Sequence, residues 1–276
     1  MKERRTMKYK VGKIAQMLDV SIETVRNYEK IGLIQPERSE QNDYRLYDPV
    51  DVNILRRART YMGYYGVSMK QSAQLLLGGD IPDLADALGE SAQGLSERIA
   101  FDIQLLMFTR EKQRHLQRIG TILNQYVVEN SPAMYGFVYR NGSLFSSDPD
   151  VQRLLHEWNQ LRPFTEASVH YDQACFLDRN YHLSQGLLIE EAYAAFFHIA
   201  AGGHIHYFPA RKCLYTFAVT ALEPDITPEN TFRFALGDAL RERGLTIAGN
   251  PFGRVVHTGK ASGRYQHYIE LWVPIE

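Results

Sequence analysis

The feature that most constrains the fold is a long stretch without helix breakers, from about Ser91 to Val128. It contains no proline, and its glycines, at positions 94 and 120, lie near its ends. Apolar residues recur three or four positions apart, which predicts an amphipathic helix. They are Leu95, Ile99, Ile103, Leu106, Leu116, Ile119, Leu123 and Val127. A helix of roughly 35 residues is about 50 Å long and too long to bury in one domain. We expect a dimerisation helix that forms a coiled coil; a core helix of a bundle is the alternative.

The chain before this stretch reads as two short helices joined by a tight turn. Val11, Ile14, Ala15 and Leu18 have helical spacing, and Asp19-Val20 interrupts the pattern. Ser21 is a good N-cap for a second helix, and Gly32 is placed to end it. Two helices of about two turns with such a connection predict a helix-turn-helix.

A small hairpin is expected next. The segment 36–43 is polar and rich in turn residues, and Tyr44–Tyr47 alternates in character, as in a wing beside a helix-turn-helix. Asp48 with Pro49 is a strong helix start. Ser68 is placed to cap one more short helix.

The distribution of charge suggests a polyanionic partner for the N-terminal part. Residues 1–80 carry 14 Lys and Arg against 10 Asp and Glu, whereas residues 131–276 carry 12 against 15. The second helix of a helix-turn-helix enters the major groove, where Ser21, Thr24 and Arg26 could reach bases or phosphates. Further candidates for backbone contacts are Lys13, Arg45, Arg56, Arg57 and Arg59.

At these residues the chain resembles the MerR family of transcription regulators. The resemblance is carried by Tyr9–Ala15, Val20-Ser21, Thr24–Ile34, Tyr44–Tyr47, Asp51-Val52 and Gly66–Ser68. It implies promoter DNA and RNA polymerase holoenzyme as partners, a homodimer held by an antiparallel coiled coil, and activation by distortion of a promoter with a long spacer. It implies DNA contacts from Lys13, Ser21, Thr24, Arg26, Tyr28, Tyr44, Arg45 and Arg57.

Beyond Pro132 the sequence changes to β-branched and aromatic runs. The expected strands are Tyr135–Arg140, Val169–Leu177, Leu187–Ile199, Ile205–Phe208, Leu214–Thr220, Val255–His257 and Tyr265–Pro274. Helices are expected from Asp148/Pro149 to about Leu161 and from Thr227/Pro228 to about Arg243. This order is a β-α-β-β unit that occurs twice, so we expect an α+β domain with an antiparallel sheet covered by helices on one face.

The last expected strand places a carboxylate among aromatic rings. Side chains alternate along a strand, so Tyr268, Glu270 and Trp272 share one face. Such a group can hold a lipophilic cation through charge attraction and cation–π contacts. An ordinary glutamate on an exposed sheet face is the alternative. Tyr135 in the first strand, and Tyr193 on a face with Glu191 and Phe197, are further candidates.

The layout of this half, with the terminal Glu270–Ile275, resembles the GyrI-like effector-binding domain. With the N-terminal part, the order of domains is similar to that of multidrug-responsive MerR-type activators. The resemblance implies a pocket for lipophilic cationic or aromatic compounds, with Glu270 at its base. The expected ligand-binding residues are Glu270, Tyr268, Trp272, Tyr135, Tyr171 and Tyr193.

Several functional classes are disfavoured. The two cysteines, Cys175 and Cys213, cannot build a disulfide framework, and a free buried thiol is expected. His198, His204, His206 and Cys213 lack a ligand spacing typical of metal sites, so neither metal nor cofactor is expected. No signal peptide or apolar stretch of membrane-spanning length is visible, and we expect a cytoplasmic protein.

We therefore expect three parts: a winged helix-turn-helix at 7–80, a linker and coiled-coil helix at 81–130, and a GyrI-like domain at 131–276. The expected function is a ligand-responsive transcription regulator and not an enzyme. Two alternatives remain, a regulator with a ligand-free protein-interaction body and a GyrI-like domain with hydrolase activity. Against the second, the chain lacks a Gly-x-Ser-x-Gly motif.

Overall fold

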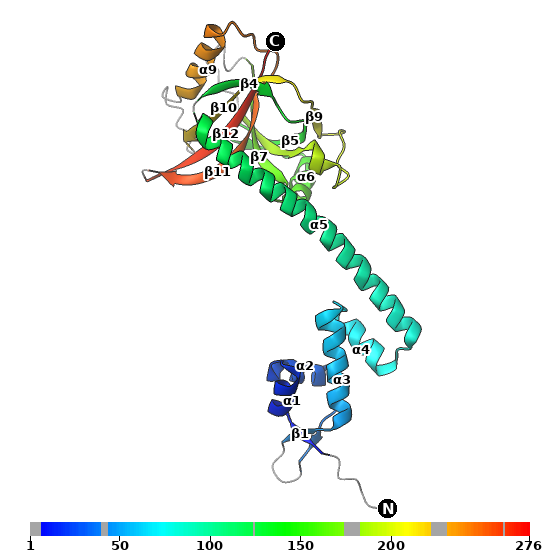
Figure 1. Cartoon of the computed structure of the whole chain (residues 1–276). Helices are drawn as coiled ribbons and strands as arrows, with labels where there is room; N and C mark the ends of the chain where they lie inside the picture. The colour runs from blue at the N-terminus through cyan, green and yellow to red at the C-terminus, as the bar shows by residue number, and fades with distance from the viewer. Residues whose placement is uncertain (1–6, 40–43, 124, 174–182, 222–230, 262) are drawn as a thin grey trace, which may run out of the picture. The chain divides into compact units, whose positions relative to one another are not determined.

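The computed structural model describes residues 7–39, 44–123, 125–173, 183–221, 231–261 and 263–276 (Figure 1). The chain divides into two compact units, Met1–Asp102 and Ile103–Glu276, which we call the head and the body. The long helix α5 (Ile81–Ile122) begins in the head and ends in the body. Among the described residues, no helix has both the length and the apolar character needed to span a membrane.

The head combines short helices with a three-stranded antiparallel sheet of order β1-β3-β2. Its elements before α5 are β1 (Tyr9–Lys10), α1 (Val11–Leu18), α2 (Ile22–Lys30), β2 (Glu37–Arg38), β3 (Arg45–Tyr47), α3 (Pro49–Arg59), a π-helical turn (Thr60–Tyr64) and α4 (Met69–Gly78). The expected helix-turn-helix and hairpin are both present. The sequence did not reveal β1, which pairs with β3.

Local capping explains where the head helices begin and end. The Ser21 side chain accepts a hydrogen bond of 3.0 Å from the Thr24 amide and starts α2, as expected. Gly32 has φ = 77°, which glycine adopts without strain after a helix. Asp48 and Ser68 start α3 and α4. Each side chain accepts from the amide of the third helical residue, and each cap amide donates to the side chain of that residue.

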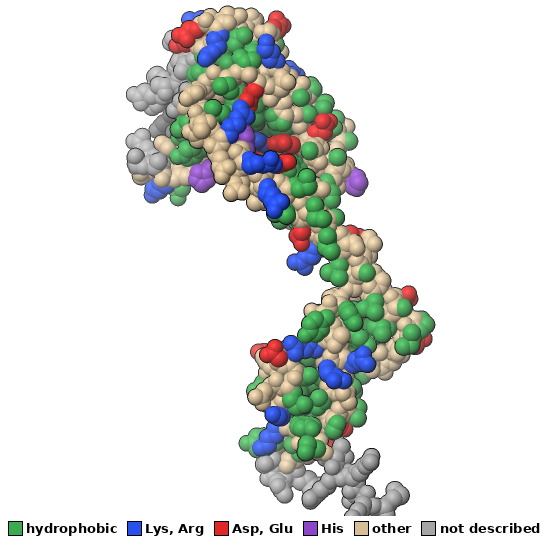
Figure 2. All heavy atoms as spheres, in the orientation of Figure 1, with side chains coloured by type: hydrophobic (Ala, Val, Ile, Leu, Met, Phe, Trp, Pro, Cys, Tyr) green, Lys and Arg blue, Asp and Glu red, His purple; other side chains and the backbone are tan. Residues whose placement is uncertain are grey.

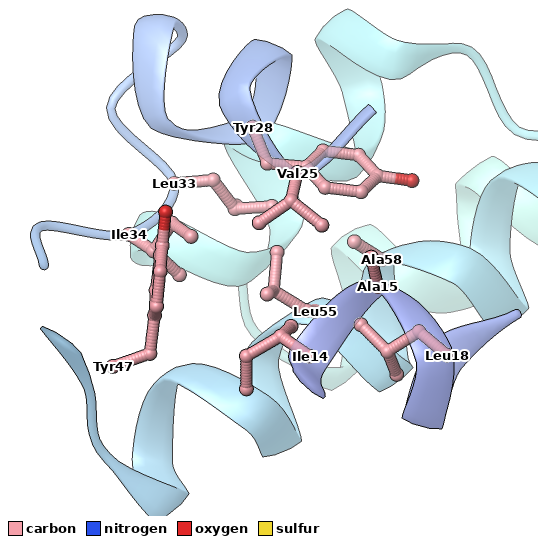
Figure 3. Close-up of a cluster of buried hydrophobic side chains, with 10 residues drawn as sticks. All are labelled: Ile14, Ala15, Leu18, Val25, Tyr28, Leu33, Ile34, Tyr47, Leu55 and Ala58. Carbon is pink, nitrogen blue, oxygen red and sulfur yellow. The ribbon is translucent and has the colours of Figure 1, made fainter. Parts of the chain in front are cut away.

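The core of the head is apolar and draws on α1, α2, the following loop, β3 and α3. Figure 3 shows ten buried side chains directed toward one another. They are Ile14, Ala15, Leu18, Val25, Tyr28, Leu33, Ile34, Tyr47, Leu55 and Ala58. Leu55 and Ala58 are both fully buried on one face of α3, as the helical spacing predicts.

The long helix differs from the expectation at both ends. It starts at Ile81, ten residues before the predicted Ser91, because Asp80 and Asp83 exchange backbone–side-chain hydrogen bonds of 3.0 Å in a capping box. It ends at Ile122. Residues 126–130, placed in the connector by the sequence, form strand β4 and pair with β10 in the body.

The body is built on one antiparallel sheet of order β4-β10-β12-β11-β7-β8-β5-β6, with β9 on β5. Its strands are β4 (Tyr126–Asn130), β5 (Met134–Asn141), β6 (Leu144–Phe145), β7 (Thr165–Tyr171), β8 (Leu183–Glu190), β9 (His206–Phe208), β10 (Lys212–Ala221), β11 (Phe252–Ala261) and β12 (Arg264–Pro274). Its helices are the end of α5, α6 (Pro149–Gln160), α8 (Glu191–Ala194) and α9 (Thr231–Glu242).

The expected duplication is present. The order β5-α6-β7-β8 is repeated as β10-α9-β11-β12, and the strand order of the second unit, β10-β12-β11, is followed in the sheet by the reversed order β7-β8-β5 of the first. Such an order predicts an approximate two-fold relation between the halves. The start expected at Thr227/Pro228, and the end of the strand expected to reach Leu177, lie outside the described residues.

The two faces of the sheet differ in chemistry. On one face, Ile269, Leu271 and Val273 pack with Leu236 and Leu240 of α9. On the same face, α6 packs on β5 through Trp158 and Phe137, whose ring centroids are 5.1 Å apart. The opposite face carries Glu270 and Trp272, as the alternation predicts, and lies against the end of α5.

One expected strand is partly wrong. We predicted a strand over Leu187–Ile199 because of its aromatic residues, but the strand ends at Glu190 and α8 follows. Glu191, Tyr193 and Phe197 therefore do not share a strand face. The Ala-rich stretch after Glu190 has helix propensity, and it prevails over the aromatic pattern here.

Candidate functional site

Three helices of the head carry exposed basic side chains. Arg26 on α2, Lys13 on α1 and Arg57 on α3 are all exposed to solvent. Ser21 and Thr24 lie at the start of α2, where their hydroxyls are hydrogen-bonded at 2.8 Å. Five of the predicted DNA-contacting side chains are therefore at the surface or the helix start, where a polyanion could meet them.

The hairpin adds a second group. Tyr44 is 55% exposed, and the ammonium of Lys10 lies over its ring at 4.9 Å from the centroid. Arg45 donates from Nε to Glu29 of α2 at 2.9 Å, which ties the hairpin to the second helix. The pairing of β1 with β3 brings Lys10 here, a contact that local sequence reading missed.

Two other head residues have structural roles. Tyr28 is only 4% exposed and belongs to the core, so the structure does not place it as a surface contact. Burial is the main cause that raises the pKa of its hydroxyl. Arg59, expected to face a phosphate backbone, donates to the Leu18 carbonyl at the end of α1 and lies 3.4 Å from Asp19.

In the body, Glu270 lies at the centre of a buried polar cluster and is fully buried. Its Oε1 accepts a hydrogen bond of 2.7 Å from the Tyr215 hydroxyl and another from His115 Nε2 of α5. Its Oε2 accepts from Arg254 Nε at 2.5 Å. Three donors from three elements, α5, β10 and β11, thus converge on one carboxylate.

These partners decide the charge of the cluster. Burial alone would raise the pKa of Glu270, but the Arg254 guanidinium and the hydrogen bond from His115 outweigh burial and lower the pKa to about 2. Burial, together with the Glu270 carboxylate, raises the pKa of Tyr215 well above its usual value. Glu270 is therefore ionised and Tyr215 is a protonated donor.

Arg254 connects this cluster to two further carboxylates. Its Nη1 donates to Glu166 at 2.8 Å and to Glu190 at 2.5 Å. The guanidinium lies 5.4 Å from the ring centroid of Trp272. The side chain of Arg254 is only 8% exposed, so one cation is shared by three carboxylates away from bulk water.

A cavity of about 200 Å³ lies between α5 and this cluster. Its lining residues are Phe108, Glu111, Lys112, His115, Glu166, Glu190, Tyr193 and Arg254. Figure 2 shows basic and acidic side chains gathered on the body where the end of α5 lies. With Glu270 counted, four carboxylates face two permanent cations, Lys112 and Arg254, so the site carries an acidic excess.

The predicted aromatic residues divide between the two sides of the sheet. Tyr268 and Trp272 share the face of Glu270. Tyr193 of α8 lies at the cavity, where its hydroxyl donates to Glu111 and its ring is 5.3 Å from Phe108. Tyr135 and Tyr171 lie on the opposite face and were wrongly grouped with Glu270: Tyr135 contacts Tyr207, and Tyr171 packs in the α9 core.

Comparison with known proteins bears first on the head. Residues 9–78 match the family model described as MerR HTH family regulatory protein. The head is a MerR-family helix-turn-helix domain. A mercuric resistance operon regulatory protein of Bacillus cereus is 44% identical over 50 residues, which are 18% of this chain. The match spans 37% of the length of that relative. Regulators of this family are DNA-binding proteins and not enzymes.

Solved structures offer more distant likenesses. EcmrR, in a complex with DNA in EcmrR-RPo, is 14% identical with a TM-score of 0.36 and covers 97% of this chain and 99% of its own. HiNmlR, a MerR family regulator lacking the sensor domain, bound to promoter DNA, is 23% identical with a TM-score of 0.33. The alignment covers 42% of this chain and 90% of HiNmlR. A hydrolase from Listeria innocua is 12% identical with a TM-score of 0.36. The alignment covers 59% of this chain and 98% of the hydrolase. Since these TM-scores are below 0.5, the family assignment rests on residues 9–78.

Sequence reasoning found Glu270 but missed its partners. The MerR-type head could be read from local motifs, whereas Arg254, Glu166 and Glu190 come from three other strands. The one feature of the sequence that could have pointed to these partners is that each is a charged residue within an otherwise strand-like segment. Without the register, nothing in the sequence indicates that Arg254 lies opposite Glu270.

Where the structure describes them, the residues weighed for metal or redox chemistry do not form one site. Cys213 is fully buried, as expected of a structural thiol, and Cys175 lies outside the described residues. Across the described part of the chain, the only His, Cys, Asp and Glu group compact enough for an ion is Asp148, Asp150 and His204. This group does not include His198, His206 or Cys213.

Proposed function

We propose that the chain is a MerR-type transcription regulator that binds promoter DNA through its head and a lipophilic cationic or aromatic compound through its body. The observation that carries the ligand assignment is the cavity, whose lining has three carboxylates and two permanent cations, with the buried Glu270 paired to Arg254 beside it. Such a site attracts positive charge. The rings of Phe108 and Tyr193 supply apolar walls. The duplicated β-α-β-β unit supports a GyrI-like body.

We propose that the DNA is double-stranded promoter DNA and that RNA polymerase holoenzyme is the further partner. The exposed Arg26 and Lys13 and the half-buried Thr24 support contacts from α2 and α1. Arg57 of α3 and the hairpin residues Tyr44 and Arg45 are proposed as further contacts. Distortion of a promoter with a long spacer, and hence activation, is part of the proposal. DNA deformation is a known means of coupling binding to output.

A homodimer is proposed through α5. Apolar side chains that are half exposed follow one another along this helix: Leu95, Ile99, Ile103, Leu106 and Met107 are each 50–57% exposed. Coiled-coil pairing of two copies would remove them from water. Four residues of the same helix line the cavity: Phe108, Glu111, Lys112 and His115. A ligand that moves α5 would therefore act on the dimerisation element.

DNA binding is tested by a gel shift on promoter fragments of the chain's own and neighbouring genes at low salt. We expect Arg26→Ala to weaken binding by roughly 1–3 kcal/mol if Arg26 reads a base. Arg153→Ala on α6 removes the same charge from the body and should leave binding unchanged. If the wild type fails to bind any such fragment, the DNA-binding proposal is wrong.

Ligand binding is tested by tryptophan fluorescence with tetraphenylphosphonium. Both tryptophans, Trp158 and Trp272, lie in the body. We expect saturable quenching that is weaker in Glu190→Gln, since Glu190 lines the cavity and is 30% exposed. Glu157→Gln, at an exposed side chain of α6, is the matched control. No saturable signal with this or other cations would favour a ligand-free body.

A further inference from the structure

The cation-binding groups of the body are already occupied by a side chain of the protein itself. Arg254 enters the cluster from β11 and uses Nε for Glu270 and Nη1 for Glu166 and Glu190. Its guanidinium also lies over the indole of Trp272. Carboxylates at the edge and an aromatic face above are the two features by which proteins bind organic cations.

The geometry is specific to a planar group with N–H donors. A guanidinium presents its donors in a fixed fork within one plane, which suits carboxylates at its edge and a ring against its face. A tetrahedral quaternary cation has no N–H donor. In the same place it would leave buried carboxylate oxygens without hydrogen bonds, which is costly.

The site can release this guanidinium without losing its other supports. Oε1 of Glu270 keeps its bonds from Tyr215 and His115, and Lys112 of α5 remains paired with Glu166. When Arg254 leaves, three carboxylate oxygens become available: Oε2 of Glu270, Oε2 of Glu166 and Oε1 of Glu190. The adjoining cavity is lined by Glu166, Glu190 and Arg254, so an incoming molecule meets Glu166 and Glu190 directly, and departure of Arg254 opens the way to Glu270.

We propose that Arg254 is a resident counter-cation that occupies the ligand subsite, and that the ligands of this cavity are planar amidinium- or guanidinium-bearing compounds that displace it. This rests on the proposed function, which makes the cavity the ligand site. Displacement exchanges one guanidinium-like group for another on the same three carboxylates. The aromatic part of the ligand then contacts Phe108 and Tyr193 in the cavity.

The test compares benzamidine, an aromatic amidinium, with tetraphenylphosphonium by titration calorimetry on the full chain. Removal of the internal competitor in Arg254→Ala should tighten benzamidine binding by about tenfold or more, which a difference of about 1.4 kcal/mol produces. Tetraphenylphosphonium should gain less. Arg140→Ala is the matched control, because Arg140 also lies over an aromatic ring, Phe145, but outside the cavity.

A second readout is thermal stability, which covers the case of a poorly folded variant. Guanidinium chloride at millimolar concentration should raise the Tm of Arg254→Ala above that in equal sodium chloride, by roughly 4–7 °C at about twenty times Kd. The wild type should show no such difference. Arg254→Lys keeps a charge on a smaller head group, and its benzamidine affinity should lie between those of the wild type and the alanine variant.

The outcomes separate this inference from the proposed function. If benzamidine binds wild type and Arg254→Ala equally, or binds the variant less tightly, and Glu190→Gln weakens both, the cavity is a cation site but the displacement is wrong. If neither cation binds any form and guanidinium does not stabilise Arg254→Ala, both proposals fail. Stabilisation by guanidinium and sodium to the same extent also contradicts the displacement.

Discussion

The head and the body handle charge in opposite ways. The buried core of the head consists of apolar side chains and two tyrosines, and the arginines in the described part of the head lie at or near the surface. The body instead buries Glu270 and Arg254 beside the end of α5. A buried ion pair repays its desolvation only with excellent geometry, so it is weak evidence for stability alone. The two units therefore differ in where their charged side chains lie, near the surface in the head and partly in the interior in the body.

The largest expected effect on stability comes from removing the buried cation of the body. Arg254→Ala leaves Glu270, Glu166 and Glu190 without their shared cation and should destabilise the body by about 3–5 kcal/mol. Tryptophan fluorescence follows this unit alone, because both tryptophans lie in it. Amide hydrogen exchange in α2 should be unchanged. A variant as stable as the wild type would mean that water reaches these carboxylates freely.

A matched change in the head tests the apolar side of the comparison. Leu55 is fully buried in the head core, and Leu55→Ala should cost about 3 kcal/mol through lost transfer energy and a cavity. Exchange in α1–α3 should accelerate and DNA binding should weaken, while tryptophan fluorescence melts stay at the wild-type midpoint. Leu77→Ala, at a residue 61% exposed on α4, is the control. A parallel loss in the body would show that the two units unfold together.

The same contrast limits what sequence can reveal. In the head, the helix starts could be predicted from the sequence, because each capping hydrogen bond joins residues three positions apart. The caps are Ser21, Asp48 and Ser68. Alternation along β12 correctly put Glu270, Tyr268 and Trp272 on one face. These successes share one cause, since each depends only on neighbours along the chain.

Contacts distant in sequence were beyond this reasoning. Arg254 lies 16 residues from Glu270, 64 from Glu190 and 88 from Glu166, and strand register alone joins them. Tyr135 and Tyr171 were grouped with Glu270 because they are aromatic, yet the pairing of β5 and β7 within the sheet puts them on its other side. Only the early start of α5 was readable and overlooked, through the Asp80–Asp83 pair.

Lowering the pH should affect the stability of the two units in opposite directions, through Glu270 in the body and Asp51 in the head. Glu270 has a folded pKa of about 2 against an ordinary value of 4.5, so its contribution is complete above about pH 5 and is lost as pH falls toward 2. The loss is roughly 3 kcal/mol. In the head, burial raises the pKa of Asp51, so its protonation in acid favours the folded state. From pH 6 to 2, fluorescence should report loss of the body before exchange reports loss of the head. Glu270→Gln should flatten the acid response of the body, and an unchanged response would assign it to another group.

The smallest expected effect concerns a helix cap in the head. The Asp48 carboxylate accepts from the amides of Val50 and Asp51 at 2.7 and 2.8 Å, and the Asp48 amide donates in turn to the Asp51 carboxylate. Asp48→Ala should cost about 1 kcal/mol, because it leaves these amides at the start of α3 without a side-chain acceptor. Asp48→Asn keeps the acceptor and should recover most of the loss. Chemical denaturation followed by exchange in α3 measures both, and the fluorescence midpoint of the body should not move. An equal loss in the two variants would mean that the charge of Asp48, and not its capping bond, stabilises the helix, and would bring electrostatics into a head that otherwise depends on apolar packing.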